Sequence, residues 1–334
     1  MKYLLTGGGG YIGLHIALAI KNSGHDVLIA DNFSNSSIDN IKHIKNVLGI
    51  SLHVEEGDIR SKDFTDKLFK KYQIDAVVHL AGLKSIPESN LKPLQYFDNN
   101  VSGTINLLRS MEKYSIKKIV FSSSASVYGD PEYLPIDEFH PTRVKNPYAR
   151  TKLQIEGILG DLTNYDPSWD IICLRYFNPV GGHDSGLLGD SPRGIPSNLM
   201  PYIAAVAANE LPILNIYGDD YDTADGTGIR DYIHVVDLAD AHLCALEFLE
   251  SSAQKNFNIF NIGTGYGCSV LEVVSAFEKS TGIKIPFQIM KRRAGDSASC
   301  YADVKNAKLF LKWEAKKNLK DMCLSAWTYK KNII

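Results

Sequence analysis

A glycine-rich turn near the amino terminus constrains the fold more than any other stretch of this sequence. Residues 2–6 are a short apolar run, residues 7–13 read GGGGYIG, and an apolar-periodic run leads to a second apolar stretch at 27–31. This order predicts strand, tight turn, helix and strand. Gly7, Gly10 and Gly13 stand three apart, as expected where a turn needs positive φ and backbone approaches a pyrophosphate. The amides that open the helix, together with its dipole, favour a bound anion.

The acidic residue that ends the second strand indicates which ligand this turn holds. Asp31 follows the glycines at the spacing of roughly 20 residues expected of a ribose-binding acid. A carboxylate there accepts hydrogen bonds from ribose hydroxyls and repels a 2′-phosphate. A glycine run alone would suit a flexible loop equally well, but its place between a strand and a helix favours a dinucleotide site. We therefore predict NAD rather than NADP as the cofactor.

Length, charge and cysteine usage exclude several classes of protein. The 334 residues suggest two domains, or one large domain with an appended lobe. With 36 Lys and Arg against 38 Asp and Glu, the chain lacks the basic balance typical of nucleic-acid binding. Five dispersed cysteines indicate reduced thiols, no apolar run approaches a membrane span, and a strand beginning at residue 2 leaves no room for a signal peptide. We expect a cytoplasmic protein with no metal, membrane or nucleic-acid partner.

Strands and helices alternate strictly through the first part of the chain. The pattern predicts further strands at 51–56, 75–80 and 118–122, with helices at 61–72 and 91–114 between them. Such alternation is typical of an α/β fold with a Rossmann-type doubly wound parallel sheet. Ligands bind at the carboxyl ends of such strands, where small residues such as Ala81 and Gly82 let a cofactor pass closely. Asp58 could meet the adenine end there, or cap the helix at 61–72, a role that Ser61 would fill equally well.

The pattern changes after Tyr128, where prolines and glycines become frequent. We predict a helix at 147–165, a strand at 170–176 and a long ligand-facing loop over 178–197. The β-α-β regularity is lost beyond that loop. The sequence therefore predicts an NAD-binding domain over 1–179 and a mainly substrate-binding, C-terminal lobe over 180–334. A helix at 235–249, with part of 230–262, is expected to return to the first domain.

A tyrosine and a lysine near the start of the 147–165 helix are candidates for acid–base chemistry. Tyr148 and Lys152 are four residues apart, so both side chains share one helix face. A phenol has a pKa of about 10, but a nearby ammonium and a positive nicotinamide ring would favour the phenolate. Such a base could take a proton from a sugar hydroxyl. The same spacing also occurs in ordinary amphipathic helices, and that alternative stays open for this pair alone.

The serine-rich end of the fifth predicted strand strengthens the catalytic interpretation. Residues 121–129 read FSSSASVYG and lie at the expected cofactor edge of the sheet. A hydroxyl at Ser124 could bond the reacting oxygen and relay its proton to Tyr148, although a plain serine-rich turn would look similar. A dinucleotide turn, this strand end and a Tyr/Lys helix in chain order make coincidence a poor explanation.

Seven stretches give the chain a resemblance to a known family. They are 6–13 (TGGGGYIG), 79–84 (HLAGLK), 98–101 (DNNV), 121–129 (FSSSASVYG), 175–179 (RYFNP), 195–202 (IPSNLMPY) and 225–234 (DGTGIRDYIH). Over almost its full length the chain resembles the UDP-glucose (UDP-galactose) 4-epimerases of the extended short-chain dehydrogenase/reductase superfamily. The last four stretches are far more specific than the glycine turn.

The resemblance implies a role for individual residues. Tyr148 would be the base, Lys152 its electrostatic partner and Ser124 the hydroxyl that bridges to the sugar. The implied NAD contacts are Gly7, Gly10, Tyr11, Ile12, Gly13, Asp31, Asn32, Ser36, Asp58, Ile59, Leu80, Ala81, Gly82, Lys84, Asn99, Ser122, Tyr148, Lys152 and Phe177. The implied substrate contacts are Lys84, Ser124, Tyr148, Asn178, Asn198, Leu199, Asn215, Tyr217, Arg230, Arg292, Asp296 and Cys300. Among these, Arg230 and Arg292 would clamp the diphosphate, or form surface ion pairs instead.

The reaction that the resemblance implies is the interconversion of UDP-galactose and UDP-glucose in Leloir galactose metabolism. The C4 hydride would pass to bound NAD and return to the opposite face of a 4-ketose, with no net redox change. Family members restricted to plain hexoses commonly carry a tyrosine in place of Cys300, so this small residue implies activity on UDP-GlcNAc and UDP-GalNAc as well. The resemblance also implies a homodimer formed by the 91–114 and 147–165 helices.

Two other functions suit parts of the sequence. Sugar-nucleotide 4,6-dehydratases and decarboxylases of the same superfamily share the first five strands. Dehydratases, however, supply a general acid from an Asp-Glu pair where this chain has Ala125 and Ser126. A non-catalytic NAD-binding protein on the same fold is the second alternative. The joint presence of Ser124, Tyr148 and Lys152 argues against it.

Overall fold

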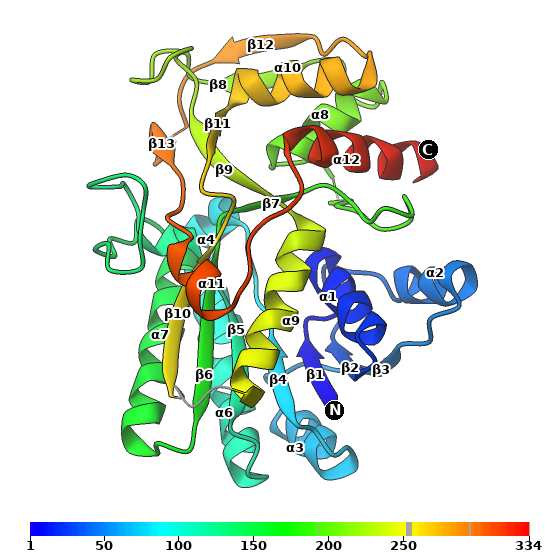
Figure 1. Cartoon of the computed structure of the whole chain (residues 1–334), viewed down its shortest axis with the longest axis vertical. Coiled ribbons are helices and arrows are strands. Elements are labelled where there is room, and N and C mark those ends of the chain that lie inside the picture. The colour runs from blue at the N-terminus through cyan, green and yellow to red at the C-terminus, as the bar shows by residue number, and fades with distance from the viewer. Residues whose placement is uncertain (193, 252–255, 294, 334) are drawn as a thin grey trace.

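A seven-stranded parallel sheet forms the centre of the molecule (Figure 1). The computed structural model describes the chain except for residues 193, 252–255, 294 and 334. In sheet order the strands are β10 (Phe257–Ile262), β6 (Asp170–Tyr176), β5 (Lys118–Ser124), β4 (Ala76–His79), β1 (Lys2–Thr6), β2 (Asp26–Asp31) and β3 (His53–Glu56). All neighbouring pairs run parallel. The predicted α/β, Rossmann-type doubly wound sheet is confirmed.

Helices cover both faces of this sheet. One face carries α1 (Tyr11–Asn22), α2 (Ile38–Leu48) and α9 (Val235–Ser251), and the other carries α3 (Lys62–Lys71), α6 (Gly103–Lys113) and α7 (Pro147–Tyr165). Successive strand residues point to opposite faces, so Leu5 packs in the core under α1 and α9 while Leu4 packs in the core under α6 and α7. Strands that are buried on both sides need uninterrupted apolar runs, which is why the sequence pattern predicted them.

The helix predicted over 91–114 is not one continuous helix, and this expectation was wrong. The segment comprises α4 (Ile86–Leu91), α5 (Pro93–Tyr96), the π-helix η1 (Phe97–Ser102) and α6. Lys92 leaves the helical region with φ −130° and ψ 53°, because Pro93 disfavours a helical residue before it and has no N–H to donate. The wider π-turn carries Asn99 and Asn100. Such turns are frequent at functional sites.

The remaining elements build two smaller sheets at one end of the large sheet (Figure 1). They are β7 (Asn178–Val180), α8 (Leu199–Ala207), β8 (Leu214–Tyr217), β9 (Ile229–His234), β11 (Gly267–Ser269), α10 (Val270–Thr281), β12 (Phe287–Met290), β13 (Ser299–Cys300) and α12 (Leu319–Ile333). The short helix α11 (Lys305–Phe310) instead packs beside β10 of the large sheet (Figure 1). A separate core joins α8, α10 and α12 to β8 and β9. The predicted loop over 178–197 begins with the short strand β7, which pairs with β9.

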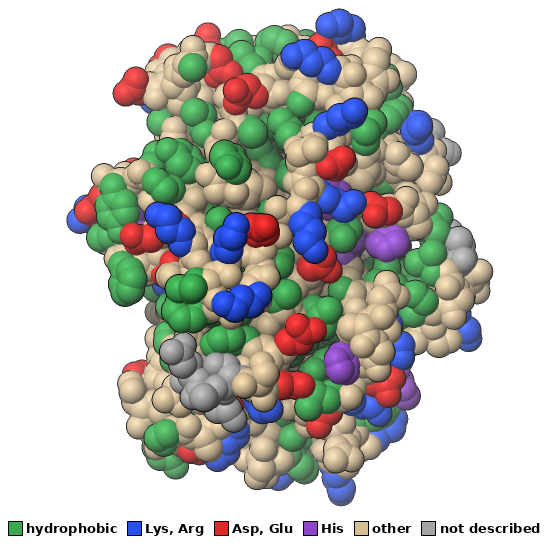
Figure 2. All heavy atoms as spheres, viewed as in Figure 1, with side chains coloured by type: hydrophobic (Ala, Val, Ile, Leu, Met, Phe, Trp, Pro, Cys, Tyr) green, Lys and Arg blue, Asp and Glu red, His purple; other side chains and the backbone are tan. Residues whose placement is uncertain are grey.

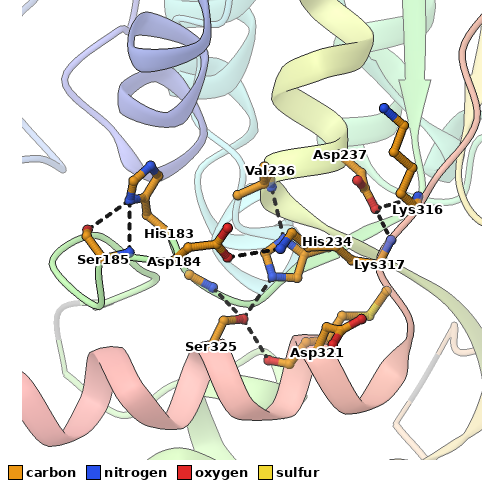
Figure 3. A network of polar contacts seen from close by, with 12 residues as sticks. His183, Asp184, Ser185, His234, Val236, Asp237, Lys316, Lys317, Asp321 and Ser325 are labelled. Atoms are coloured by element: carbon orange, nitrogen blue, oxygen red, sulfur yellow. Dashed lines mark hydrogen bonds and ion pairs between the residues drawn. The ribbon is translucent and has the colours of Figure 1, made fainter. Parts of the chain in front are cut away.

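A polar network attaches the C-terminal segment to the rest of the chain (Figure 3). Ser325 on α12 lies 2.8 Å from Nε2 of His234 and accepts from the amide of Gly182 at 3.1 Å. Asp237 on α9 accepts from the amides of Lys316 and Lys317 at 3.0 and 2.8 Å. These bonds hold α12 against the junction of β9 and α9.

The surface carries charged side chains of both signs (Figure 2). Acidic and basic side chains are interspersed over the face in view in Figure 2. Among the described residues, no helix has the length and apolarity needed to cross a bilayer. Within that same part of the chain, no group of His, Cys, Asp and Glu side chains is arranged to hold a metal ion.

Candidate active site

The glycine turn between β1 and α1 is built for close backbone contact. Gly7 has φ +70°, and a Cβ there would lie 2.6 Å from the amide nitrogen of Ala81. A Cβ on Gly13 would lie 2.6 Å from Gly8 Cα, whereas one on Gly10 would meet nothing closer than 3.6 Å. Gly7 and Gly13 are therefore required by packing, and Gly10 leaves the start of α1 open. No side chain caps this helix, so its first amides suit a pyrophosphate group.

The residues predicted to hold the adenosine half lie together at the ends of β2 and β3. Asp31 accepts from the amides of Gly9 and Phe33 at 2.9 and 2.8 Å and from Oγ of Ser36 at 3.1 Å. Asn32 donates to Asp58 at 3.0 Å. This cluster gathers the side chains predicted to bind the adenosine half of NAD around the carboxylate of Asp31.

Asp58 does not cap the following helix. Ser61 is the N-cap of α3 and accepts from the amide of Phe64 at 3.3 Å, so the alternative that Ser61 fills this role is the one observed. Asp58 instead pairs with Arg60 at 2.8 Å, and these hydrogen bonds lower the pKa of the Asp58 carboxyl to about 2. It stays ionised beside the predicted adenosine site.

The π-turn reaches the end of β4 through an asparagine that the sequence analysis did not single out. Asn100 accepts from the amide of Leu83 at 2.7 Å, donates to its carbonyl at 3.0 Å, and donates to Oγ1 of Thr151 at 3.0 Å. A Cβ on Gly82 would lie 3.2 Å from its side-chain oxygen. Asn100 thus fixes the small-residue stretch that follows β4. Its neighbour Asn99, the predicted NAD contact, is half-buried.

The three predicted catalytic residues meet at the carboxyl end of β5. Ser124 is the last residue of that strand and Tyr148 is the second residue of α7, and their side chains are hydrogen-bonded. Lys152 lies one turn further along α7, and its ammonium donates to the carbonyl oxygen of Ser122 at 2.6 Å. Ser124 also accepts from Oγ of Ser126 at 2.9 Å. The structure therefore brings Ser124, Tyr148 and Lys152 together at the carboxyl end of β5, two strands along the sheet from β1 and its glycine turn.

Burial dominates the acid–base properties of this group. It raises the pKa of the Tyr148 phenol, while the hydrogen bond from Ser124 lowers that pKa. It also lowers the pKa of Lys152 to about 8, which the Glu156 carboxylate opposes. We expected a nearby ammonium and a nicotinamide ring to lower the pKa of Tyr148, but in the protein alone burial has the largest effect on it. The positive charge of an oxidised nicotinamide would favour the phenolate further.

A buried ionic network beneath Lys152 was not foreseen. Glu156, one turn further along α7, pairs with Arg175 on β6 at 2.7 Å, and Nη1 of Arg175 donates to the Tyr128 hydroxyl at 2.9 Å. Ser123 donates to the same carboxylate. No local motif marks such a pair, because its members lie 19 residues apart and meet only through the sheet.

The loop after β7 adds another acidic residue that the sequence analysis missed. Asp190 is hydrogen-bonded to Asn198 and lies in the field of Lys84, while burial raises the pKa of its carboxyl. Asn198 and Leu199 begin α8, and Asn178 begins β7. Two predicted substrate residues, Lys84 and Asn198, are therefore linked by one carboxylate.

The predicted diphosphate and nucleoside contacts gather around Tyr221. The guanidinium carbon of Arg292 lies 4.1 Å above the Tyr221 ring, and its Nε bonds Asp220 at 2.6 Å. Arg230, Arg292 and Asp296 all act electrostatically on the Tyr221 hydroxyl. That hydroxyl is buried and has no hydrogen-bond partner in the described part of the chain. Arg292 thus forms the surface ion pair that remained as an alternative, but it does so beside Arg230.

The other predicted substrate residues line the neighbouring strands. Asn215 and Tyr217 lie on β8, where Asn215 accepts from Gln288 at 2.7 Å and Arg293 lies 5.0 Å from the Tyr217 ring centre. Cys300 on β13 pairs in register with Arg230 on β9. It packs against the cluster that contains Ala125 and Phe177, and burial raises the pKa of its thiol to about 11. It is a small, neutral side chain close to the serine-rich strand end.

Comparisons with known proteins agree with this site. The NAD dependent epimerase/dehydratase family matches residues 3–263. The UDP-glucose 4-epimerase of Bacillus subtilis is 49% identical and covers 98% of this chain and 96% of its own length.

Two solved structures share the whole fold. UDP-glucose 4-epimerase from Stenotrophomonas maltophila, solved with bound NAD and formylated UDP-arabinopyranose, has a TM-score of 0.97 and 46% identity, covering 100% of this chain and 98% of that one. The UDP-Glc/GlcNAc 4-epimerase of Campylobacter jejuni has a TM-score of 0.85 and 35% identity, covering 99% of each chain. Together with the family match over most of the chain, these likenesses show that the protein belongs to the NAD dependent epimerase/dehydratase family, where its full-length relatives are UDP-glucose 4-epimerases.

Proposed function

We propose that this protein interconverts UDP-galactose and UDP-glucose, using bound NAD to oxidise and reduce C4 of the hexose transiently. The observation that carries the proposal is the meeting of Ser124, Tyr148 and Lys152 at the carboxyl edge of the parallel sheet, the same edge that carries the open glycine turn. Relatives at nearly half identity over their full length carry the same activity in their names. The enzyme is accordingly an NAD-dependent isomerase.

Each residue of the site has a distinct task in this reaction. Tyr148, as phenolate, takes the proton from the 4-hydroxyl and later returns it, and Ser124 holds the reacting oxygen by a hydrogen bond. Lys152 remains cationic below about pH 8 and stabilises the phenolate. NAD, when bound, supplies a reversible hydride acceptor at C4. The redox change cancels over one turnover, so the cofactor need not leave.

The anchoring of the substrate follows from the same balance. The hexose must rotate in the site so that its opposite face receives the hydride. The fixed contacts therefore belong on the UDP. Arg230 and Arg292 can pair with phosphate oxygens, since a guanidinium matches them bidentately. We infer that Arg292 exchanges its ion pair with Asp220 for one with the diphosphate.

A single incubation tests the proposal. The purified protein, without added cofactor, is mixed with UDP-galactose in deuterated water, and the products are identified by NMR. We expect UDP-glucose that keeps its original hydrogen at C4. A product that carries solvent deuterium at C4, or no product even after NAD is added, would contradict the proposal.

The same incubation separates the rival functions. A 4,6-dehydratase would release a 4-keto-6-deoxy sugar, but Ala125 and Ser126 provide no general acid for loss of water. A non-catalytic binder would leave UDP-galactose unchanged. It would also give no absorbance at the NADH band when substrate is added.

We further propose that UDP-GlcNAc and UDP-GalNAc are substrates, because Cys300 leaves space that a bulkier residue would fill. The Campylobacter jejuni relative is named for both sugars, which supports this extension. Assays with UDP-GlcNAc beside UDP-galactose decide it: turnover of only UDP-galactose would end this part of the proposal.

The cellular setting and assembly are inferred from other features. All five cysteines are free thiols, which supports a reducing, cytoplasmic location. A role in Leloir galactose metabolism rests on the proposed interconversion of UDP-galactose and UDP-glucose. We also propose that residues 1–179, with part of 230–262, form the NAD-binding domain, and that 180–334 mainly form the UDP-sugar lobe. Leu91 at the end of α4 and Leu94 on α5 are more than 80% exposed, which supports a homodimer through this face.

A further inference from the structure

A series of hydrogen bonds connects a buried histidine, His242, to Lys152. His242 lies on α9, is fully buried, and its Nδ1 is 2.8 Å from the carbonyl oxygen of Leu238. A carbonyl only accepts, so Nδ1 carries the hydrogen. Burial lowers the pKa of His242 to about 4, which keeps the ring neutral near pH 7. Its Nε2 is therefore a hydrogen-bond acceptor.

The tautomer of His242 sets the direction of the next bond. The Tyr176 hydroxyl contacts Nε2 of His242 and must donate to it. The oxygen of Tyr176 is then free to accept, and the Ser122 side chain is its other hydrogen-bond partner. Ser122 lowers the pKa of Tyr176, as a donor to that oxygen should, although burial raises this pKa overall. Ser122 therefore donates to Tyr176.

Ser122 is also the residue that holds Lys152. Its carbonyl oxygen accepts from the Lys152 ammonium at 2.6 Å. Ser122 is thus fixed by its side chain toward Tyr176 and by its main chain toward Lys152. The series of hydrogen bonds that begins at His242 therefore ends at Lys152. Tyr176 also lies within electrostatic range of Tyr148.

We propose that His242 and Tyr176 are positioning residues for Lys152. They act through Ser122 and set the distance between the ammonium and the Tyr148 phenol. Neither residue is assigned a proton transfer, because their hydrogen bonds reach Lys152 only through Ser122. This inference rests on the proposed function, in which Lys152 stabilises the Tyr148 phenolate.

Other charged or titratable groups face Lys152 from several elements. They are Glu156 on α7, Cys173 on β6 and His79 on β4. None of these is bonded to His242 or Tyr176. Removing the Tyr176 hydroxyl therefore changes the hold on Ser122 and leaves the charges around Lys152 as they are.

Three variants and one matched control test the proposal. Tyr176→Phe and His242→Phe each remove the hydrogen bond between the two residues. The double variant therefore removes no further bond between them. Tyr3→Phe is the control, because Tyr3 belongs to the same core and its buried side chain donates to Glu250 at 2.8 Å, away from the site. For each protein, kcat and KM for UDP-galactose are measured from pH 5.5 to 9, beside the melting temperature.

We expect Tyr176→Phe and His242→Phe to lower kcat by roughly tenfold to a hundredfold, with KM within about twofold, since small displacements at a reacting centre are costly. The acid limb of the kcat profile should move to higher pH, because a less fixed ammonium favours the phenolate less. The double variant should be no slower than the slower single variant. Tyr3→Phe should lower only the melting temperature.

The opposite results are distinguishable. If Tyr176→Phe matches Tyr3→Phe in kcat and in its pH profile while wild type epimerises normally, the positioning role is wrong and the proposed function stands. If wild type itself forms no UDP-glucose, the proposed function fails and this inference fails with it. Should His242→Phe not fold, the pH profile of Tyr176→Phe alone decides.

Discussion

Arg175 and Glu156 form a bidentate ion pair in the interior, with Nε 3.0 Å from Oε1 and Nη2 2.7 Å from Oε2. Both side chains are about 5% exposed or less. Replacing Glu156 with Gln would leave the guanidinium charge buried without its counter-ion. We expect the free energy of unfolding to fall by about 3–5 kcal/mol, the usual result of breaking a buried pair from one side.

Urea unfolding of Glu156→Gln measures this loss. The matched control is Lys42→Met, which removes one partner of the exposed Lys42–Asp39 pair and should leave the midpoint nearly unchanged. The Gln variant should also move the alkaline limb of kcat to lower pH, because Glu156 opposes the fall in the pKa of Lys152. Equal urea midpoints for Glu156→Gln and Lys42→Met would contradict the stabilising role of the buried ion pair.

Tyr148→Phe tests the base directly. The variant keeps the ring and removes the only group at this position that can accept the proton, so kcat should fall by about two to four orders of magnitude. NAD should remain bound, which the absorbance of the purified protein reports. Tyr165→Phe is the matched control at the other, exposed end of α7 and should turn over normally. Near-normal turnover by Tyr148→Phe would remove this residue from the role.

The sheet and the catalytic trio were predictable because their signals are local. A buried parallel strand must be an apolar run, and a glycine turn must follow the first one, so the pattern alone predicts the fold. Tyr148 and Lys152 lie on one helix turn, and Ser124 ends a predicted strand. The break at Pro93 also had a local signal that was overlooked, since proline starts a helix more readily than it continues one.

The supporting groups could not be predicted from single positions. His242 and Tyr176 are 66 residues apart in sequence, and Glu156 and Arg175 are 19 apart, yet each pair is in contact. Such contacts depend on sheet order and on which face a helix buries. The dominance of burial over charge in the pKa of Tyr148 likewise follows from packing, which a motif does not describe.

Buried histidines should make the fold sensitive to acid. Burial lowers the pKa of His15 and His79 to about 3 and that of His242 to about 4, below the ordinary value of 6.5. Below pH 6.5 the unfolded chain binds protons that the folded chain excludes, so stability is lost as pH falls through this window. Each histidine contributes a slope of about 1.4 kcal/mol per pH unit.

Urea unfolding at pH 7 and pH 5 measures this slope. His79→Gln should reduce the slope by about 1.4 kcal/mol per pH unit, which is the contribution of one proton, because this buried ring excludes a proton that the unfolded chain binds. Equal slopes in wild type and His79→Gln would show that the histidine is protonated in the folded state.

Cys300 should control which sugars fit. Cys300→Tyr adds a ring close to Ala125 and Phe177, so turnover of UDP-GlcNAc should fall at least tenfold more than that of UDP-galactose, as steric exclusion in a pocket predicts. Cys300→Ser keeps the size of the side chain and should preserve the ratio. Competition between the two sugars, followed by chromatography, gives the ratio of kcat/KM directly. A ratio unchanged by the tyrosine would exclude Cys300 as the determinant.

The apolar surface beside α5 should decide the oligomeric state. Leu91 and Leu94 are 82% and 83% exposed, which is costly in water unless another molecule covers them. Leu91→Glu with Leu94→Glu would place two charges in a dimer interface, so sedimentation velocity should show a monomer where wild type is a dimer. Phe139→Glu is the matched control, because Phe139 is likewise 88% exposed but belongs to neither α4 nor α5. If the leucine variant kept the wild-type mass, the dimer would have to use another surface, and if wild type were a monomer, the proposed assembly would be wrong.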